Sequence, residues 1–420
     1  MPEWFQAGAP HIWLPYTQMQ TAPDALPVVS AEGCRLRLAD GREIIDGTAA
    51  WWSMCHGYQH PAIVQAIHEQ SQTLSHVMFA GLAHESAYRL AAELAQLTGL
   101  ERVFFSDSGS TSVEVALKMA LQYWRNQGKP RKSKIIHFTH GYHGDTFGAM
   151  SVSSRDGFHT AYDSLTTRHF QLDIPEDEYS MAECTDMIAG IADKTAALII
   201  EPLVQGAGGM KFHSPDVLAA LRSLCRDHDI LFIADEIMTG FYRTGTRFAC
   251  EEAGIMPDII CVGKALTGGH IGLAATLASA DVFAGFLSDD SQHALMHGPT
   301  FMANPIACAA ALASCQLFAA SDYTEHAARI ETQLREGLNP LRPLPGIADV
   351  RVTGAIGVVE FANAPTDIFA LRAECVKRGV WLRPFGTCFY LMPPLVIEQG
   401  ELQRVIDVTC EVITDWSQRL

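Results

Sequence analysis

The chain has 420 residues, a formal net charge of −17, 48% hydrophobic residues and 18% charged residues. This composition supports a large core and excludes a mostly disordered protein, and the length allows two or three domains. The acidic balance disfavours nucleic acid and anionic membranes as partners, and no apolar run approaches the roughly 20 residues that span a bilayer. The 11 cysteines form no Cys-x-x-Cys pair, and no signal peptide is evident, so we expect a cytoplasmic location.

The N-terminal region begins with about 30 residues rich in proline and aromatic side chains, which predict extended, irregular chain. Residues 34–38 then alternate with period two. Asp40-Gly41 and residues 43–46 follow, a pattern that predicts a β-hairpin. Pro61 opens a predicted helix, and a second helix is expected over roughly residues 85–97.

Strands and helices alternate in the middle of the chain. Residues 102–106 predict a strand that turns into a helix, where Thr111 and Glu114 have the spacing of a capping box. This alternation predicts an α/β fold with a mostly parallel, doubly wound sheet. Further strands are expected near residues 134–139, 196–201, 230–235 and 258–262, with a helix at 215–228.

The C-terminal region begins with an Ala-rich helix after Asn304-Pro305 and a polar helix that ends near Leu338. The Pro-rich stretch 340–345 indicates a domain boundary. The elements beyond it predict a small α/β domain, which the N-terminal hairpin could join. We therefore expect three segments: an arm and hairpin (1–50), a large domain (51–305), and a connecting helix with the small domain (306–420).

Two residues at predicted strand ends indicate a cofactor site. Lys264 follows the apolar strand 259–262 and Gly263, at the place where open α/β sheets bind ligands. A single lysine there is more often a surface residue, but a partly desolvated one can form a Schiff base. Asp235 ends another strand 264 − 235 = 29 residues earlier. A carboxylate that keeps the ring nitrogen of pyridoxal phosphate protonated is the partner that such a lysine needs.

Other residues in this region suggest further contacts to such a cofactor. Residues 108–111 form a strand-to-helix turn that suits ordinary N-capping and a phosphate seat about equally. Gly298-Pro299-Thr300 offers a second hydroxyl-bearing turn. Tyr142, in a Gly-rich turn after a strand, is either a core aromatic residue or a ring stacked on a flat cofactor.

Other residues could bind a metal ion or a substrate. Asp235-Glu236 and three histidines invite a metal site, but the histidines alternate faces along a strand and enter a Gly-rich turn, so we expect no metal. Arg383 is either in a surface ion pair or a bidentate clamp on a substrate carboxylate. Trp51-Trp52 is either core or the wall of an apolar channel. The histidines are His137, His140 and His143.

The stretches 232–240 (FIADEIMTG) and 258–269 (DIICVGKALTGG) resemble the signature of the class III aminotransferases, which are pyridoxal-phosphate enzymes of fold type I. Tyr242 and Ser53-Met54-Cys55 depart from the pattern and could reshape the substrate entrance. Supporting stretches extend over nearly the whole chain, namely 11–17, 51–58, 75–79, 141–148, 296–301 and 379–385.

This resemblance implies a role for each matching residue. Lys264 would form the Schiff base and later move a proton, Asp235 would pair with the pyridinium nitrogen, and Tyr142 would stack on the ring. Arg383 would bind the substrate carboxylate. The phosphate would be held by Gly109 and Ser110 together with Pro299 and Thr300 of a neighbouring subunit, and the substrates would contact Tyr16, Trp51, Asp145, Gly298 and Arg383.

The resemblance also implies an activity. The amino group of S-adenosylmethionine would pass through pyridoxal phosphate to 8-amino-7-oxononanoate, giving 7,8-diaminononanoate in biotin synthesis. The enzyme would be a homodimer with its active site at the subunit interface. Two alternatives stay open: a class III enzyme that takes ornithine, lysine or another ω-amine as donor, and a metal-dependent hydrolase that uses Asp235, Glu236 and the histidines.

Overall fold

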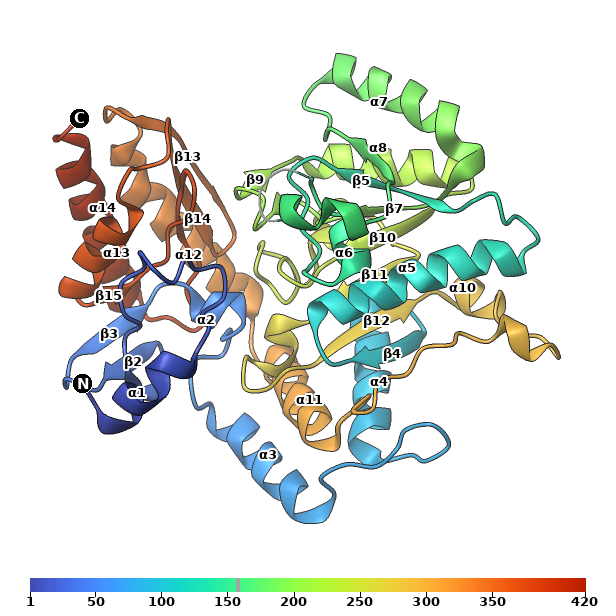
Figure 1. Cartoon of the computed structure of the whole chain (residues 1–420), viewed down its shortest axis with the longest axis horizontal. Coiled ribbons are helices and arrows are strands. Elements are labelled where there is room, and N and C mark those ends of the chain that lie inside the picture. Colours follow the sequence, from blue (N-terminus) through green and yellow to red (C-terminus); the bar gives the residue numbers. More distant parts are fainter. Residues whose placement is uncertain (156–158) are drawn as a thin grey trace. The chain divides into compact units, whose positions relative to one another are not determined.

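The computed structural model describes residues 1–155 and 159–420. The chain forms two compact units, residues 61–324 and residues 1–60 with 325–420 (Figure 1). The domain boundaries predicted near residues 50 and 305 differ from the limits of these compact units. They stay a prediction. The N-terminal segment was predicted to be irregular, but it contains a short helix, α1 (Glu3–Gly8), and a 3-10 turn, η1 (Ala9–His11).

A seven-stranded sheet forms the centre of the unit 61–324, in the order β4-β12-β11-β10-β7-β5-β6. β12 runs antiparallel to both of its neighbours, and the other pairs are parallel. The predicted mostly parallel sheet is therefore confirmed. The strands are β4 (Arg102–Ser106), β5 (Lys134–Phe138), β6 (Phe170–Leu172), β7 (Thr195–Ile200), β10 (Leu231–Asp235), β11 (Ile259–Val262) and β12 (Ala274–Ala278).

The central strands are buried along their whole length, because helices cover them. α5 packs its apolar stripe, including Val113 and Ala116, against Ile199 and Ile233 of the sheet. The helices of this unit are α3 (Pro61–Thr73), α4 (Glu85–Thr98), α5 (Gly109–Asn126), α6 (Phe147–Ser151), α7 (Glu178–Ile191), α8 (Pro215–Asp227), α9 (Ala249–Glu252), α10 (Ala280–Ala284) and α11 (Pro305–Ala320), with the short ribbon β8 (Val204–Gln205) and β9 (Lys211–Phe212).

The strand directions bring several chain turns to one edge of this sheet. β12 separates β4 from β11 and is antiparallel to both, so β4 and β11 point the same way as β10, β7 and β5. The residues that follow these five strands therefore share the carboxyl edge, where open α/β sheets bind ligands.

The start of α5 differs from the prediction. Ser108 is the N-cap, and its side chain and that of Thr111 form a reciprocal capping box. Glu114 was expected to complete such a box with Thr111. Its carboxylate instead accepts hydrogen bonds from the backbone N–H groups of Gly148 (2.7 Å) and Ala149 (3.3 Å). The prediction failed because the N-cap is Ser108, three residues before the expected cap Thr111.

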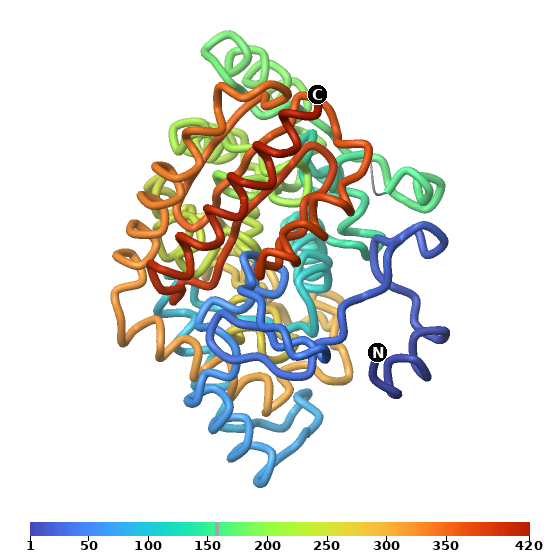
Figure 2. Tube along the Cα trace, turned by 90° about the vertical axis from the view of Figure 1, so that its left-hand side faces the viewer, coloured from blue at the N-terminus to red at the C-terminus, as the bar shows by residue number. Residues whose placement is uncertain are grey.

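The second unit joins the two ends of the chain. Its four-stranded sheet has the order β1-β2-β3-β15, and the hairpin predicted before residue 46 is confirmed by the antiparallel pair β2 and β3. β15 adds to β3 in parallel, so elements near both termini lie side by side (Figure 2). The strands are β1 (Val28–Glu32), β2 (Arg35–Leu38), β3 (Glu43–Asp46), β15 (Val380–Trp381) and, in a second sheet, β13 (Ile347–Thr353), β14 (Ile356–Phe361) and β16 (Cys388–Leu391).

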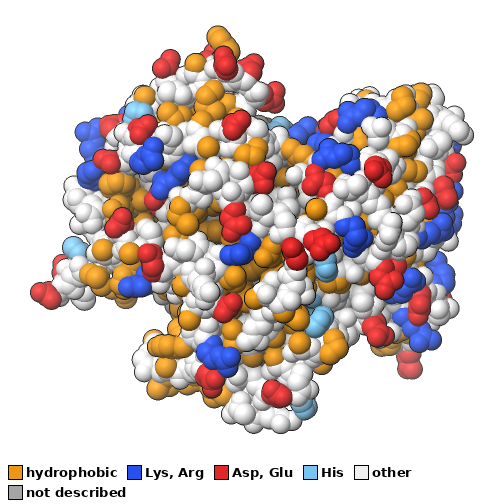
Figure 3. All heavy atoms as spheres, turned by 180° about the vertical axis from the view of Figure 1, so that it is seen from behind, with side chains coloured by type: hydrophobic (Ala, Val, Ile, Leu, Met, Phe, Trp, Pro, Cys, Tyr) orange, Lys and Arg blue, Asp and Glu red, His pale blue; other side chains and the backbone are white. Residues whose placement is uncertain are grey.

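Besides α1, the helices of this unit are α2 (Ala49–Trp52), α12 (Tyr323–Leu338), α13 (Ile368–Lys377) and α14 (Gln399–Ser417). In the part of the chain that the structure describes, no single helix is long and apolar enough to cross a membrane. α11 and the helical stretch from Tyr323 to Leu341 pass that test only as a pair bent by 76°. Acidic and basic side chains are interspersed on the face drawn in Figure 3.

Candidate active site

Lys264 begins the 3-10 turn η4 (Lys264–Thr267) directly after β11 and Gly263. Its φ of 46° lies in the left-handed region, which a residue with a Cβ seldom adopts and which often marks a functional position. Burial lowers the pKa of the Lys264 ammonium, and the carboxylates of Asp235 and Glu201 oppose that shift. A lowered lysine pKa increases the share of neutral amine, which is the nucleophilic form.

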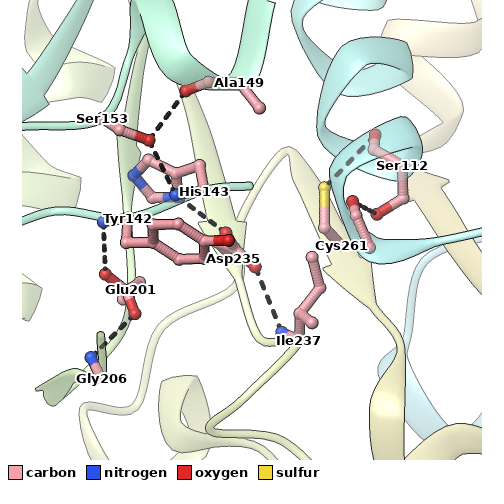
Figure 4. A network of polar contacts seen from close by, with 11 residues as sticks. Ser112, Tyr142, His143, Ala149, Ser153, Glu201, Gly206, Asp235, Ile237 and Cys261 are labelled. Carbon is pink, nitrogen blue, oxygen red and sulfur yellow. Dashed lines mark hydrogen bonds and ion pairs between the residues drawn. The ribbon is translucent and has the colours of Figure 1, made fainter. Parts of the chain in front are cut away.

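Asp235 ends β10 next to β11, paired in register with Cys261. Its Oδ2 atom lies 2.7 Å from Nδ1 of His143, and both side chains are buried (Figure 4). Its Oδ1 atom accepts a hydrogen bond from the backbone of Ile237 at 3.2 Å. The backbone N–H of His143 donates to Ser153 Oγ at 2.9 Å. The carboxylate is thus held in one orientation at the carboxyl edge of the sheet.

Glu201 follows β7 at the same edge and is 5% exposed. Its two oxygens accept hydrogen bonds from the backbone N–H groups of Tyr142 and Gly206, each at 2.9 Å (Figure 4). Burial raises the pKa of Glu201 to about 7, with His143 lowering it and Asp235 raising it. Glu201 therefore ties the loop of Tyr142 to the loop after β7, in electrostatic range of Lys264.

The Tyr142 ring stacks on the ring of His159, with centroids 5.8 Å apart and an interplanar angle of 24°. His159 is buried, and its Nε2 atom lies 3.2 Å from Oδ1 of Asp145. His159 thus connects two of the predicted site residues, Tyr142 and Asp145.

The N-terminus of α5 meets the Tyr142 loop. A Cβ added to Gly144, whose φ is 118°, would lie 2.3 Å from Cβ of Ser110. The hydroxyl of Ser108 lies 3.3 Å from that of Ser110 and 3.1 Å from that of Thr111. Three hydroxyls at the N-terminus of an 18-residue helix provide donors and a helix dipole that favour an anion such as a phosphate.

The turn that contains Gly298, Pro299 and Thr300 lies elsewhere in the chain. Gly298 and Thr300 are exposed, and the Thr300 carbonyl accepts a hydrogen bond from His76 Nε2 at 2.8 Å. Within residues 1–155 and 159–420, no hydrogen bond joins this turn to Ser110. A single chain therefore does not assemble the two predicted phosphate contacts through hydrogen bonds.

The remaining predicted residues, Tyr16, Trp51 and Arg383, lie together in the other unit. The Arg383 guanidinium carbon is 4.6 Å from the centroid of the Trp51 ring, and the Tyr16 ring meets Trp51 edge-on at 5.8 Å. Trp51 is 39% exposed, whereas Trp52 is buried and packs edge-on against Tyr390 at 6.0 Å. The Trp pair thus divides into one core residue and one accessible residue beside an arginine.

The backbone around Trp51 is unusual. Four consecutive residues of α2, Ala49 to Trp52, have φ values of 48°, 48°, 66° and 76°. They form a left-handed helical turn, in which the Trp52 and Ser53 N–H groups bond to the carbonyls of Thr48 and Ala49. Left-handed helical backbone costs about 1–2 kcal/mol per residue with a Cβ, so surrounding contacts must stabilise this turn.

The candidate metal ligands lie in different surroundings and do not form one cluster in the described residues. Glu236 accepts hydrogen bonds from Thr239 Oγ1 and from the backbone N–H groups of Ala249 and Cys250, so it binds the N-terminus of α9 and not Asp235. His137 is buried in β5, where burial lowers its pKa to about 3. In the described segments, no group of three His, Cys, Asp or Glu residues has the geometry to hold a metal ion.

Comparison with known proteins identifies the family. The family model for aminotransferase class III matches residues 16–413, so the chain belongs to the class III aminotransferases. The chain is therefore a transaminase that depends on pyridoxal phosphate, and the hydrolase alternative is wrong.

Similar proteins include the adenosylmethionine-8-amino-7-oxononanoate aminotransferase of Mycobacterium leprae, which is 45% identical over 96% of this chain and 95% of its own length. The crystal structure of the same kind of enzyme from Methanocaldococcus jannaschii has a TM-score of 0.94 at 30% identity and covers 98% of both chains. A PLP-bound amine transaminase from an uncultivated Pseudomonas species has a TM-score of 0.90 at 32% identity and covers 96% of this chain and 98% of its own.

The residues at the carboxyl edge fit this cofactor. Glycine at position 144 leaves the space that lets the loop of Tyr142 approach Ser110 at the helix N-terminus. Asp235 provides a buried carboxylate for a ring nitrogen, and Lys264 provides an amine with a lowered pKa. Sequence reasoning considered His143 only as a metal ligand and missed its contact with Asp235, and it missed the roles of Glu201 and His159. A carboxylate after the strand 196–200 was a usable signal for Glu201, since Asp235 occupies the same kind of position.

Glu201→Gln should change how stability depends on pH. The folded-state pKa of about 7 lies above the ordinary 4.5, so the folded protein keeps a proton that the unfolded chain loses between these values. The stability from this group is present below pH 4.5 and is lost as pH rises through 7. The wild type minus variant difference in unfolding free energy should fall by at most about 3 kcal/mol over this range. Denaturant unfolding at several pH values measures it.

Glu183→Gln, a change of an exposed carboxylate on α7, is the control and should leave a nearly constant difference. A pH-independent difference for Glu201→Gln would show that Glu201 does not take up a proton on folding.

Proposed function

We propose that this protein transfers the amino group of S-adenosylmethionine to the keto carbon of 8-amino-7-oxononanoate, forming 7,8-diaminononanoate for biotin synthesis. The observation that carries the proposal is the 45% identity, over 96% of the chain, to a relative named for this activity. The paired strand ends that hold Asp235 and Lys264 support the transamination chemistry.

When bound, pyridoxal phosphate supplies an electron sink for the carbanion and carries the amino group between the two half-reactions. The neutral amine of Lys264 would move a proton from the substrate carbon to the cofactor carbon in one half-reaction and in the opposite direction in the other. Asp235, held by His143, keeps the ring nitrogen protonated. Tyr142 lies against the ring from the loop that Glu201 holds.

The phosphate binds at Gly109 and Ser110, where the dipole of α5 favours an anion. Pro299 and Thr300 of the partner subunit complete this seat in a homodimer. The exposure of Gly298 and Thr300 supports a contact in trans. A cytoplasmic location is supported by the 11 cysteines, none of which forms a disulfide in the described residues and ten of which are buried.

Substrate recognition uses the predicted residues Tyr16, Trp51, Asp145, Gly298 and Arg383. Arg383 binds the substrate carboxylate, and Trp51 and Tyr16 form an aromatic surface beside it that suits a bulky nucleoside and an aliphatic chain. Asp145 and Gly298 add polar and backbone contacts.

The second candidate function is transfer from an ω-amine, ornithine or lysine. The likeness to an amine transaminase, at a TM-score of 0.90, favours it. A donor screen with purified, cofactor-loaded protein separates the two candidates. We expect 7,8-diaminononanoate, detected by mass spectrometry, with S-adenosylmethionine as donor. Product formation with lysine but not with S-adenosylmethionine would support the second candidate.

Lys264→Ala should leave the fold intact and abolish turnover, because no other amine replaces the one at the end of β11. Borohydride treatment of the wild type should attach the cofactor covalently to Lys264, and peptide mass mapping locates it. Lys129→Ala, which removes an exposed lysine paired with Asp229, is the matched control and should keep full activity. Retained turnover in Lys264→Ala would contradict the assignment.

Arg383→Ala should raise the substrate KM roughly 10- to 100-fold, because a charge-assisted bidentate contact is lost. The Kd for pyridoxal phosphate, followed by the visible spectrum, should hardly change. Arg335→Ala, an exposed arginine in the same unit, should leave both unchanged. Equal losses in substrate and cofactor binding would count against a carboxylate clamp at Arg383.

A further inference from the structure

Asp46 is a fully buried carboxylate that the proposed chemistry does not use. It ends β3 and accepts four hydrogen bonds. Oδ1 accepts from the Thr48 N–H and the Thr48 hydroxyl, both at 2.8 Å. Oδ2 accepts from the Ala50 N–H and from the Tyr58 hydroxyl, both at 2.7 Å. Burial, followed by the Asp46 charge, raises the pKa of Tyr58, so the phenol keeps the proton that it donates.

These bonds are directed at the left-handed turn. Thr48 is the residue before the turn and Ala50 lies inside it. The first N–H groups of any helical turn have no partner within the turn, and here Asp46 accepts from two of them. The hydrogen bond to Tyr58 connects the carboxylate to chain beyond the end of the turn. Asp46 therefore stabilises a backbone conformation that residues with a Cβ disfavour.

The turn determines where Trp51 points. The direction of a Cα–Cβ bond follows the handedness of the backbone, so a right-handed turn would move the Trp51 ring away from its place. In the left-handed turn the ring lies beside the Arg383 guanidinium at 4.6 Å.

The chain continues from the paired strands β3 and β15 to Trp51 and Arg383, respectively. Asp46 is paired in register with Trp381 of β15, and the Gly47 N–H donates to the Trp381 carbonyl at 3.0 Å. Arg383 follows two residues later. A Cβ on Gly47 would lie 2.6 Å from the Leu382 side chain, so the two segments are closely packed. Both sides of the Trp51–Arg383 contact are thus built from the end of the β3–β15 pair.

We propose that Asp46 is a positioning residue for substrate recognition: it holds the left-handed turn 49–52 so that Trp51 orients Arg383 toward the carboxylate of the substrate. This inference rests on the proposed role of Arg383. A residue that only stabilises the unit would affect folding and every kinetic constant together, whereas a positioning residue affects substrate binding selectively.

Asp46→Asn tests the proposal. The amide group cannot accept from the Ala50 N–H in the place of Oδ2, so the turn loses a buried bond. We expect the KM for 8-amino-7-oxononanoate to rise roughly tenfold, with kcat and the Kd for pyridoxal phosphate changed less than about twofold. Asp40→Asn, at an exposed hairpin carboxylate in the same unit, is the matched control and should keep all three constants.

Ala50→Gly added to Asp46→Asn should restore most of the loss. Ala50 is exposed, so no packing is lost, and glycine adopts the left-handed conformation without steric cost. Tyr58→Phe is the milder variant if Asp46→Asn does not fold. It removes one of the four bonds and should raise the same KM about two- to fivefold without altering the cofactor spectrum.

A crystal structure of Asp46→Asn shows the cause directly. We expect residues 49–52 to leave the left-handed region, or to become disordered, and the Trp51 ring to leave Arg383. An unchanged turn, a failure of Ala50→Gly to rescue, or equal losses in KM, kcat and cofactor affinity would overturn the proposal. If wild-type protein does not use S-adenosylmethionine, the proposed function fails, but the crystal structure still decides whether Asp46 holds the turn.

Discussion

The buried hydrogen bond between Asp235 and His143 is the contact on which the candidate site depends. A carboxylate at 4% exposure is unfavourable without a partner, and this one has an imidazole at 2.7 Å and a backbone N–H at 3.2 Å. The two side chains come from the loop after β5 and the end of β10, so the bond joins chain segments from non-adjacent strands. It fixes an acid beside β11, the strand that Lys264 follows after Gly263, and it supports the proposed pairing of Asp235 with a ring nitrogen.

Buried carboxylates recur as organising groups elsewhere in the molecule. Glu201 joins the loops of Tyr142 and Gly206, Glu236 joins the end of β10 to α9, and Asp46 joins β3 to the turn of Trp51. Each accepts backbone N–H groups that a loop would otherwise leave unsatisfied. Their surroundings differ. Glu201 has a pKa raised to about 7 and lies in electrostatic range of Lys264, whereas Glu236 binds the N-terminus of α9.

The residues proposed for the transamination chemistry and those proposed for substrate choice lie in different parts of the chain. Lys264, Asp235 and the N-terminus of α5 belong to the sheet unit, and their arrangement suits any transamination. Tyr16, Trp51 and Arg383 belong to the unit built from both chain ends. An accessible tryptophan beside an arginine can meet an apolar chain that ends in a carboxylate, so this second group is where substrate preference within the family can change without altering the cofactor site.

The sequence by itself determined the sheet, the hairpin and the positions of Lys264 and Asp235, because apolar runs and turn residues are local signals and parallel strands place their ends at one edge. The resemblance of the motifs also identified the family to which the chain belongs. The roles of the site residues stay predictions. Only the tertiary structure decided that His143 bonds to Asp235, that Ser108 rather than Thr111 caps α5, and that Ala49 to Trp52 turn left-handed. The first and third of these features depend on contacts between residues separated in the sequence, such as His143 with Asp235 and Tyr58 with Asp46, and local patterns carry no information about such pairs. The Ser108 cap is a local contact, and the prediction placed it three residues too late.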